Sequence, residues 1–397
     1  MSVKKVILHL GMPKTGTTSI QNTLFNNTAL LQQNSFRYLT EWGRNHLANF
    51  HYLLSPHPVY PRATGNLGKS LVNLKQKNRN SIKKMLNAVN TTECETLIIS
   101  GEYFHELYLD ATIENIKDFI EKYFKSNGIE TTLIYLIRNP LTWIISFLQQ
   151  RLYKNGFMNK EVDFFEARIK QYEGIINLKN NFPDSLQILK FEDACLDGNG
   201  LVGYFLKAIG FPEDELININ TSRSNDSKCI EIMEFVYHIE SVEPLYPYNN
   251  YRYLNKNRFV GDLRGLKNIK GVKFDLPYQS KIELWDRLQE TLYLLKKNTS
   301  IDYSEYKVSS PSFAEQETYN KETIQGFIDA FPKLSIVLQR HFLNFFEKKY
   351  IETAQEKFMR LHSFDSIPWK LHNRKNALFN LLLFQTKNIM RRILRKN

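Results

Sequence analysis

A short apolar run that leads into a loop with two glycines constrains the fold of this chain more than any other feature. Val6–Leu10 is typical of a buried strand, and the loop Gly11–Thr18 follows it with the sequence GMPKTGTT. A helix is expected to begin near Thr17. Glycines let a backbone turn tightly, and successive N–H groups together with the positive end of a helix point at an anion. The segment Gly11–Thr18 is therefore predicted to be a phosphate loop.

Three further apolar runs end at polar or glycine-bearing turns: Thr96–Ser100, Thr131–Ile137 and Leu186–Phe191. Helical patterns lie between them, and this alternation is typical of βα units around a parallel sheet. Ligands of such sheets bind at the carboxyl ends of the strands. The sequence therefore predicts an α/β fold whose site lies where these runs end.

The position of the lysine separates this phosphate loop from that of nucleotide triphosphatases. Their pattern, GxxxxGK[ST], has lysine directly after the second glycine. Here Thr17 holds that position, and the lysine lies within the loop as Lys14, two residues before Gly16. No carboxylate set with a convincing spacing for magnesium accompanies the loop. A nucleotide kinase or triphosphatase is therefore the disfavoured alternative.

A second cluster follows the run Thr131–Ile137. Arg138 stands at the end of this strand, Pro140 suits the first turn of a helix, and Ser146 lies about two helical turns further on. A guanidinium fork matches two phosphate oxygens, and a hydroxyl can donate a further hydrogen bond. We call residues 138–146 the arginine arm and expect it to hold a second phosphate.

Both segments resemble the donor site of sulfotransferases that use 3′-phosphoadenosine 5′-phosphosulfate (PAPS), and in particular the bacterial carbohydrate type. The resemblance rests on PKTGTT in the phosphate loop and on the R-[DN]-P…S arrangement of the arginine arm. It covers roughly residues 4–230. It implies that the 5′-phosphosulfate is held by Lys14, Thr15, Gly16, Thr17 and Thr18, and the 3′-phosphate by Arg138 and Ser146.

The resemblance also implies the fold and the reaction. We expect a three-layer parallel sheet of the P-loop nucleotide-kinase-like type over residues 1–308, followed by a helical C-terminal extension over 309–397. The expected activity is transfer of a sulfuryl group from PAPS to an acceptor hydroxyl or amine. Lys14 would neutralise the charge that develops on the leaving oxygen, and no metal is required.

An acceptor of this kind needs a group that takes its proton. Glu102 follows the second predicted strand at the same sheet edge as Lys14. Relatives that act on carbohydrates place a glutamate near this strand end, although here it is shifted by a few residues from the glucosaminyl sulfotransferase pattern. A helix-capping carboxylate is the alternative role for Glu102. His105 is the substitute base, whereas His9 is expected in the core.

Two loop-like insertions, at about 41–80 and 246–277, are expected to carry substrate contacts. Aromatic, histidine and proline residues are frequent between Glu41 and Arg62, and tyrosines alternate with basic residues such as Arg258 in the second segment. Long loops of this kind often bind ligands, although a packed surface excursion is an equal alternative for the first. These loops favour a glycan or glycolipid acceptor over a small phenol.

The formal net charge of +12 favours polyanionic partners. Eight basic and no acidic residues lie between 370 and 397, where apolar residues recur at helical spacing. We expect a basic amphipathic helix that binds an anionic membrane surface or a protein partner, and no nucleic acid. A non-enzymatic basic binding protein is the remaining alternative.

The cysteines and the amino terminus indicate the compartment. Cys94, Cys195 and Cys229 are far apart, which suggests neither a disulfide framework nor a zinc site. The first residues lack the apolar core of a signal peptide, and no apolar run approaches the roughly 18–20 residues of a spanning helix. We expect a cytoplasmic protein, or one held at the inner membrane face by its basic helix.

Overall fold

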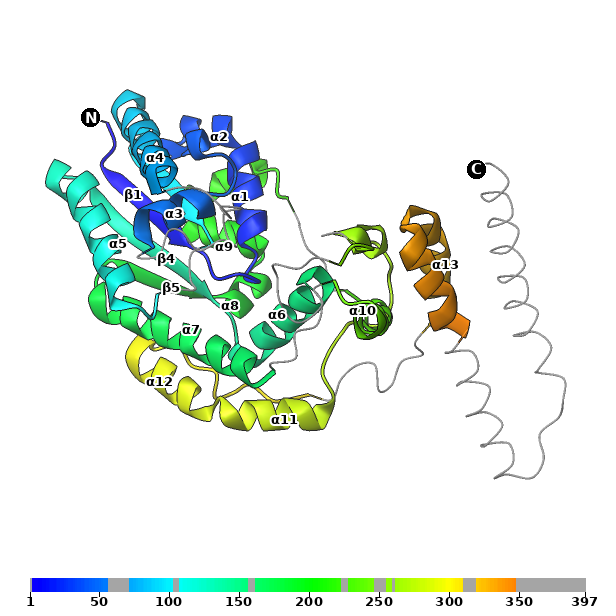
Figure 1. Ribbon diagram of the computed structural model, residues 1–397. Coiled ribbons are helices and arrows are strands. Elements are labelled where there is room, and N and C mark those ends of the chain that lie inside the picture. The colour runs from blue at the N-terminus through cyan, green and yellow to red at the C-terminus, as the bar shows by residue number, and fades with distance from the viewer. Residues whose placement is uncertain are drawn as a thin grey trace, which may run out of the picture. The chain divides into compact units, whose positions relative to one another are not determined.

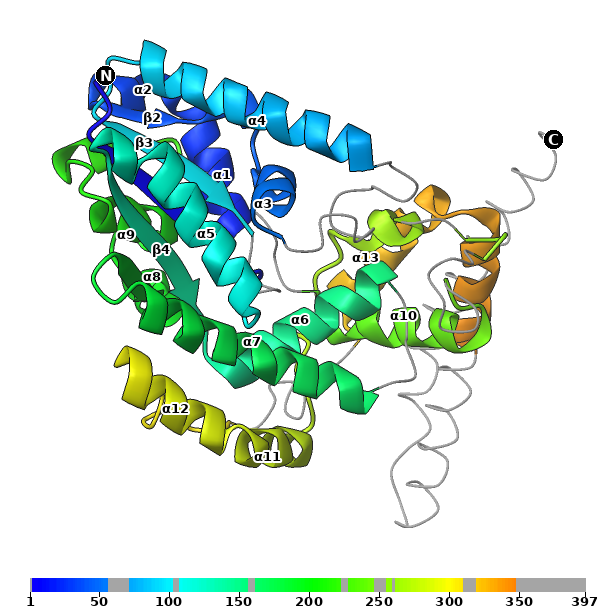
Figure 2. The ribbon, with the colours of Figure 1, turned by 60° about the vertical axis from the view of Figure 1, so that its left-hand side comes forward.

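The structure is a computed structural model, and it describes residues 2–55, 71–102, 107–155, 161–222, 228–245, 255–258, 261–309 and 319–347. Its centre is a five-stranded parallel sheet with the order β2-β3-β1-β4-β5; β1, β4 and β5 are labelled in Figure 1, and β2 and β3 in Figure 2. The strands are β1 (Lys5–Leu10), β2 (Phe36–Tyr38), β3 (Thr96–Gly101), β4 (Glu130–Ile137) and β5 (Leu186–Lys190). This confirms the predicted α/β fold with its parallel sheet.

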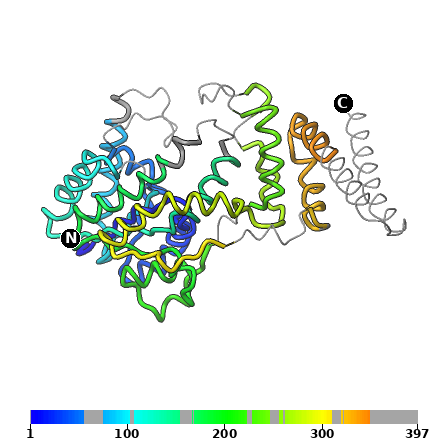
Figure 3. The backbone as a smooth tube through the Cα atoms, turned by 90° about the horizontal axis from the view of Figure 1, so that it is seen from below, coloured from blue at the N-terminus to red at the C-terminus, as the bar shows by residue number. Residues whose placement is uncertain are grey.

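Helices connect the strands and continue after the last one. They are α1 (Thr17–Asn26), α2 (Thr28–Gln33), α3 (Leu47–Leu54), α4 (Leu71–Thr91), α5 (Asp110–Tyr123), α6 (Pro140–Asn155), α7 (Glu161–Asn181), α8 (Phe191–Leu196), α9 (Gly200–Ala208), α10 (Ile230–Val242), α11 (Tyr278–Arg287), α12 (Gln289–Thr299) and α13 (Lys321–Ala330). Beyond the sheet, α12 packs against α7 and α10 packs against α6 (Figures 2 and 3).

The sheet has a hydrophobic core on each face, because alternate residues of a strand point to opposite sides. Val6, Leu8 and Leu10 of β1 belong to one core, which residues of α4, α5 and α7 complete. Ile7 belongs to the other core, together with residues of α1 and α9. Strands that are buried on both faces have continuous apolar sequences. Because helices cover both faces of the sheet, the three predicted layers are present (Figures 1 and 2).

The segment 41–62 was predicted to be irregular, and this is wrong for residues 47–54, which form α3. Phe50 and Leu54 of this helix are buried in the first core. The helix also lies close to the end of β3, since a Cβ atom on Gly101 would come within 2.5 Å of the Phe50 ring. Residues 56–70 are outside the described part of the chain. The short edge strand β2 was not predicted.

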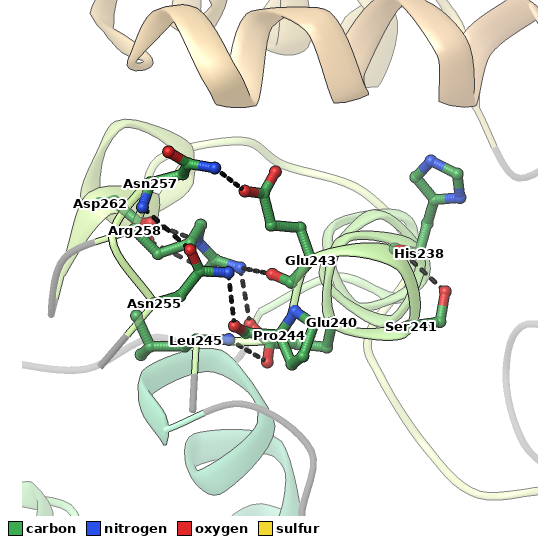
Figure 4. Close-up of polar contacts among 10 residues, drawn as sticks. All are labelled: His238, Glu240, Ser241, Glu243, Pro244, Leu245, Asn255, Asn257, Arg258 and Asp262. Carbon is green, nitrogen blue, oxygen red and sulfur yellow. Dashed lines mark hydrogen bonds and ion pairs between the residues drawn. The ribbon is translucent and has the colours of Figure 1, made fainter. Parts of the chain in front are cut away.

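Arg258 belongs to a buried cluster of charges (Figure 4). The side chains of Arg258, Glu240 and Asp262 are 0%, 1% and 2% exposed. The guanidinium donates to Glu240 Oε1 at 3.0 Å, to the carboxylate of Asp262, and to the carbonyl of Glu243 at 2.9 Å. Arg258 lies in the segment that is expected to carry substrate contacts, but its donors are used inside the protein.

The chain divides into two compact units, Met1–Ser335 and Ile336–Asn397. The first holds the sheet and α13, so it continues past the boundary expected after residue 308. Of the second, residues 336–347 are described, and they are helical. The basic segment 370–397 lies outside the described residues, as do 246–254. Among the helices that are described, none is long and apolar enough to cross a membrane.

Candidate functional site

The phosphate loop leaves the central strand β1 and enters α1 at Thr17, as predicted. Lys14 and Gly16 have left-handed backbone conformations, with φ of 67° and 76°. The φ of Gly16 favours glycine, and a Cβ atom there would also meet the Leu201 side chain, with Cδ2 at 1.9 Å. Lysine, unlike glycine, has a Cβ atom, and holding Lys14 in the left-handed conformation costs roughly 1 kcal/mol. Strain of this kind is common at ligand-binding loops.

Two threonine hydroxyls brace the loop from inside. Thr15 Oγ1 and Thr17 Oγ1 both donate to the carbonyl of Met12, at 2.5 and 3.1 Å, and both side chains are buried. Thr17 stands where a triphosphatase has its lysine. In the structure its hydroxyl is bonded within the loop.

The start of α1 supplies donors that other residues do not use. Ser19 and Ile20 donate their backbone N–H groups to the carbonyl of Gly16. The N–H groups of residues 15–18 donate to no other residue within the described ranges. The first N–H groups of a helix have no intrahelical partner, and together with the helix dipole they bind anions. The backbone at 15–18 is therefore suited to a phosphate or sulfate.

The arginine arm lies directly against the phosphate loop. Arg138 Nη1 donates to the carbonyl of Lys14 at 3.1 Å, and Trp143 Nε1 donates to the carbonyl of Pro13 at 2.7 Å. Arg138 Nε donates to Thr142 Oγ1 at 3.1 Å. These bonds hold the strained backbone around Lys14. The structure thus brings together the two predicted segments, which are far apart in sequence.

The guanidinium of Arg138 is only partly exposed, and it lies over the Phe191 ring at 5.1 Å from the ring centroid. Burial lowers the pKa of Arg138, while the nearby negative charge of Glu192 raises it. Ser146 is half-buried on α6, whose first turn is capped by Asn139 through its Oδ1 atom at 3.0 Å from the Leu141 nitrogen. An arginine partly removed from water binds an anion more strongly than one on the surface.

Glu102 lies beside the start of the phosphate loop. The last residues of β1 and β3, Leu10 and Gly101, are partners in the sheet, and Gly11 N donates to the carbonyl of Gly101 at 2.8 Å. Glu102 comes next in the chain and is half-buried. Its backbone is therefore at the same sheet edge as Lys14, as predicted. His105 lies outside the described residues.

His9 is a core residue, as predicted. Its side chain is 0% exposed, and Nδ1 lies 2.8 Å from Ser100 Oγ. Burial lowers the pKa of His9 to about 3, so the ring is neutral near pH 7. In the part of the chain that the structure covers, no group of three or more His, Cys, Asp or Glu side chains is placed to hold a metal ion.

Sequence reasoning missed three residues that support the site: Trp143, Tyr172 and Glu192. Trp143 bonds the phosphate loop, Tyr172 Oη donates to the carbonyl of Arg138 at 2.9 Å, and Glu192 Oε1 accepts the Asn139 N–H at 2.9 Å. All three bond to main-chain groups. In the sequence, only the polar pair Glu192-Asp193, which follows the predicted strand Leu186–Phe191, pointed to one of these three residues.

The chain was compared with known proteins. No family model matches it, and no curated protein matches it significantly. Solved structures with similarity include a sulfotransferase from Alicyclobacillus acidocaldarius, at 14% identity over 56% of this chain and 87% of that one, with a TM-score of 0.36. A retinol dehydratase in complex with androsterone and the inactive cofactor PAP is similar at 16% identity, 76% and 83% coverage, and a TM-score of 0.35.

A third similar structure is the sulfotransferase domain from the curacin biosynthetic pathway. It is 16% identical over 56% of this chain and 79% of that domain, with a TM-score of 0.32.

Proposed function

We propose that this protein is a sulfotransferase that moves a sulfuryl group from PAPS to an acceptor hydroxyl or amine. The observation that carries the proposal is the contact between the phosphate loop and the arginine arm, where Arg138 donates to the carbonyl of Lys14 at 3.1 Å. Lys14, Arg138 and the N–H groups at 15–18 then belong to adjacent segments at one edge of the sheet. This set suits a nucleotide with phosphates at both ends of its ribose.

The residues have separate tasks in this reaction. The acceptor oxygen or nitrogen attacks the sulfur of PAPS, and the bond from sulfur to the bridging phosphate oxygen breaks. The proton of the acceptor passes to Glu102, while the ammonium of Lys14 neutralises the charge on the leaving oxygen. The products are a sulfated acceptor and adenosine 3′,5′-bisphosphate (PAP). None of these steps needs a metal ion.

A transfer assay tests the proposal. The full chain is incubated with PAPS labelled in its sulfate and with a panel of acceptors, in the presence and absence of a metal chelator. We expect labelled acceptor under both conditions. Loss of activity with chelator and its return with magnesium would support a nucleotide kinase instead.

Glu102→Gln is expected to lower turnover about a hundredfold, because the amide keeps the shape of the side chain but cannot accept a proton. The affinity for PAP should stay within about twofold, since Glu102 acts on the acceptor. Steady-state kinetics and calorimetric titration measure the two quantities. A variant with a normal rate would show that another group is the base, and His105 is the first candidate.

The acceptor in this proposal is a glycan or glycolipid. It is supported by the aromatic and basic residues of the segments at about 41–80 and 246–277. The basic residues between 370 and 397 further support contact with an anionic membrane surface or a protein partner at the inner membrane face.

A further inference from the structure

The carboxylate of Glu192 bonds to the backbone of the arginine arm. Glu192 is in the first turn of α8, directly after β5. Its Oε1 accepts the Asn139 N–H at 2.9 Å, and its Oε2 accepts a hydrogen bond from Tyr303 Oη at 3.3 Å. Glu192 therefore links the end of β4 to the segment around Tyr303, which itself packs into the first core.

The peptide unit between Arg138 and Asn139 is held on both sides. Its N–H is bonded to Glu192, and its carbonyl accepts the hydroxyl of Tyr172, which is 0% exposed, at 2.9 Å. A peptide plane fixed in this way fixes the direction in which the side chain of Arg138 leaves the strand.

The carboxylate bonds to the peptide that follows Arg138, while the guanidinium makes its own bonds to Lys14 and Thr142. Glu192 therefore acts on Arg138 through the backbone, and not through a bond to the guanidinium. The guanidinium lies over the Phe191 ring, 5.1 Å from the ring centroid. This arrangement holds an arginine ready for an anion without the carboxylate taking the place of that anion.

We propose that Glu192 is a positioning residue for the 3′-phosphate of the donor, and that it acts by clamping the peptide between Arg138 and Asn139. This inference rests on the proposed function. It predicts that nucleotide selectivity depends on the length of the side chain at 192 and not on its charge. The quantity to measure is the selectivity of the protein for PAP over adenosine 5′-phosphate, which lacks the 3′-phosphate.

Two conservative variants separate length from charge. Glu192→Gln keeps the length, because its amide oxygen can accept the Asn139 N–H and its amide nitrogen can donate to Tyr303. Glu192→Asp keeps the charge but withdraws the acceptor by one methylene. We expect Glu192→Gln to retain the wild-type selectivity within about twofold, and Glu192→Asp to lose about tenfold, the size of one hydrogen bond to a charged group.

Calorimetric titrations of both nucleotides into the full chain give the result, with Asp193→Asn as the matched control. Asp193 is the next residue and its side chain is 52% exposed, so its variant should behave as wild type. Unchanged selectivity in Glu192→Asp would overturn the inference, as would an equal loss in both variants of Glu192. A wild type that does not distinguish the two nucleotides would instead contradict the proposed function.

Discussion

Lys14→Ala is expected to lower kcat by about 10²–10³, the usual effect of removing one group that stabilises transition-state charge. The affinity for PAP should fall much less, because the charge that Lys14 neutralises develops on the leaving oxygen as the bond to sulfur breaks. Steady-state kinetics give the first quantity and calorimetric titration with PAP gives the second. Alanine keeps the Cβ atom that causes the left-handed strain at this position, so the variant leaves that strain in place.

Lys117→Ala is the matched control for this variant. Lys117 lies on α5, where it forms an exposed ion pair with Glu114 at 2.9 Å. Its replacement should change neither kcat nor the affinity for PAP. Equal losses of turnover and of PAP affinity in Lys14→Ala would mean that Lys14 only binds the nucleotide, and its catalytic role would be refuted.

Arg258→Ala is expected to destabilise the fold by about 3–5 kcal/mol, the cost of breaking a buried ion pair. The reason is that Glu240 and Asp262, which are 1% and 2% exposed, would be left as buried carboxylates without a cation. The bonds from Arg258 to the Glu243 carbonyl would also be lost. The shift in the midpoint of urea unfolding, followed by tryptophan fluorescence, measures the change.

Lys296→Ala tests whether burial is the cause of the large loss of stability expected for Arg258→Ala. Lys296 pairs with Asp302 at 2.7 Å, but the two side chains are 59% and 40% exposed. Exposed pairs contribute about 0–1 kcal/mol, so this variant should unfold almost as the wild type does. If Arg258→Ala were equally mild, the buried cluster would not be a major source of stability.

The strands of the sheet could be predicted because most of them are buried on both faces. Val6–Leu10 has an apolar residue for each core, and the runs that became β3, β4 and β5 share this property to a large extent. Phe36–Tyr38 has three residues, which is too short for a periodic signal. The helix Leu47–Leu54 was missed because its histidine and its aromatic residues resemble those of a loop, and its burial depends on tertiary contacts.

The two segments of the candidate site could be predicted because their chemistry lies in local patterns. Lys14 and Gly16 stand in one loop, and Arg138 directly follows a strand. The residues that join these segments act on main-chain groups, and such contacts leave no pattern in the sequence. Glu192, for example, bonds to an N–H that any residue at position 139 other than proline would supply.

The buried ion pairs of Arg258 could not be predicted from the sequence either. Its partner Asp262 is four residues away, but Glu240 lies on another element and is brought near only by the fold. An arginine among tyrosines and lysines is typical of a binding loop. Only the packing of α10 against this segment reveals that the guanidinium is used internally.

Arg138 lies against the phosphate loop, and the proposed function assigns it the 3′-phosphate of the donor. Calorimetric titration of wild type and Arg138→Ala with PAP and with adenosine 5′-phosphate tests this assignment directly. We predict that wild type prefers PAP, and that the variant loses about ten- to over a hundredfold in affinity for PAP, since a hydrogen bond to a charged group is worth roughly 1.5–3 kcal/mol. Adenosine 5′-phosphate should bind both proteins alike. Equal weakening of both nucleotides would contradict the claim, because Arg138 would then support the loop through the Lys14 carbonyl without reading the phosphate.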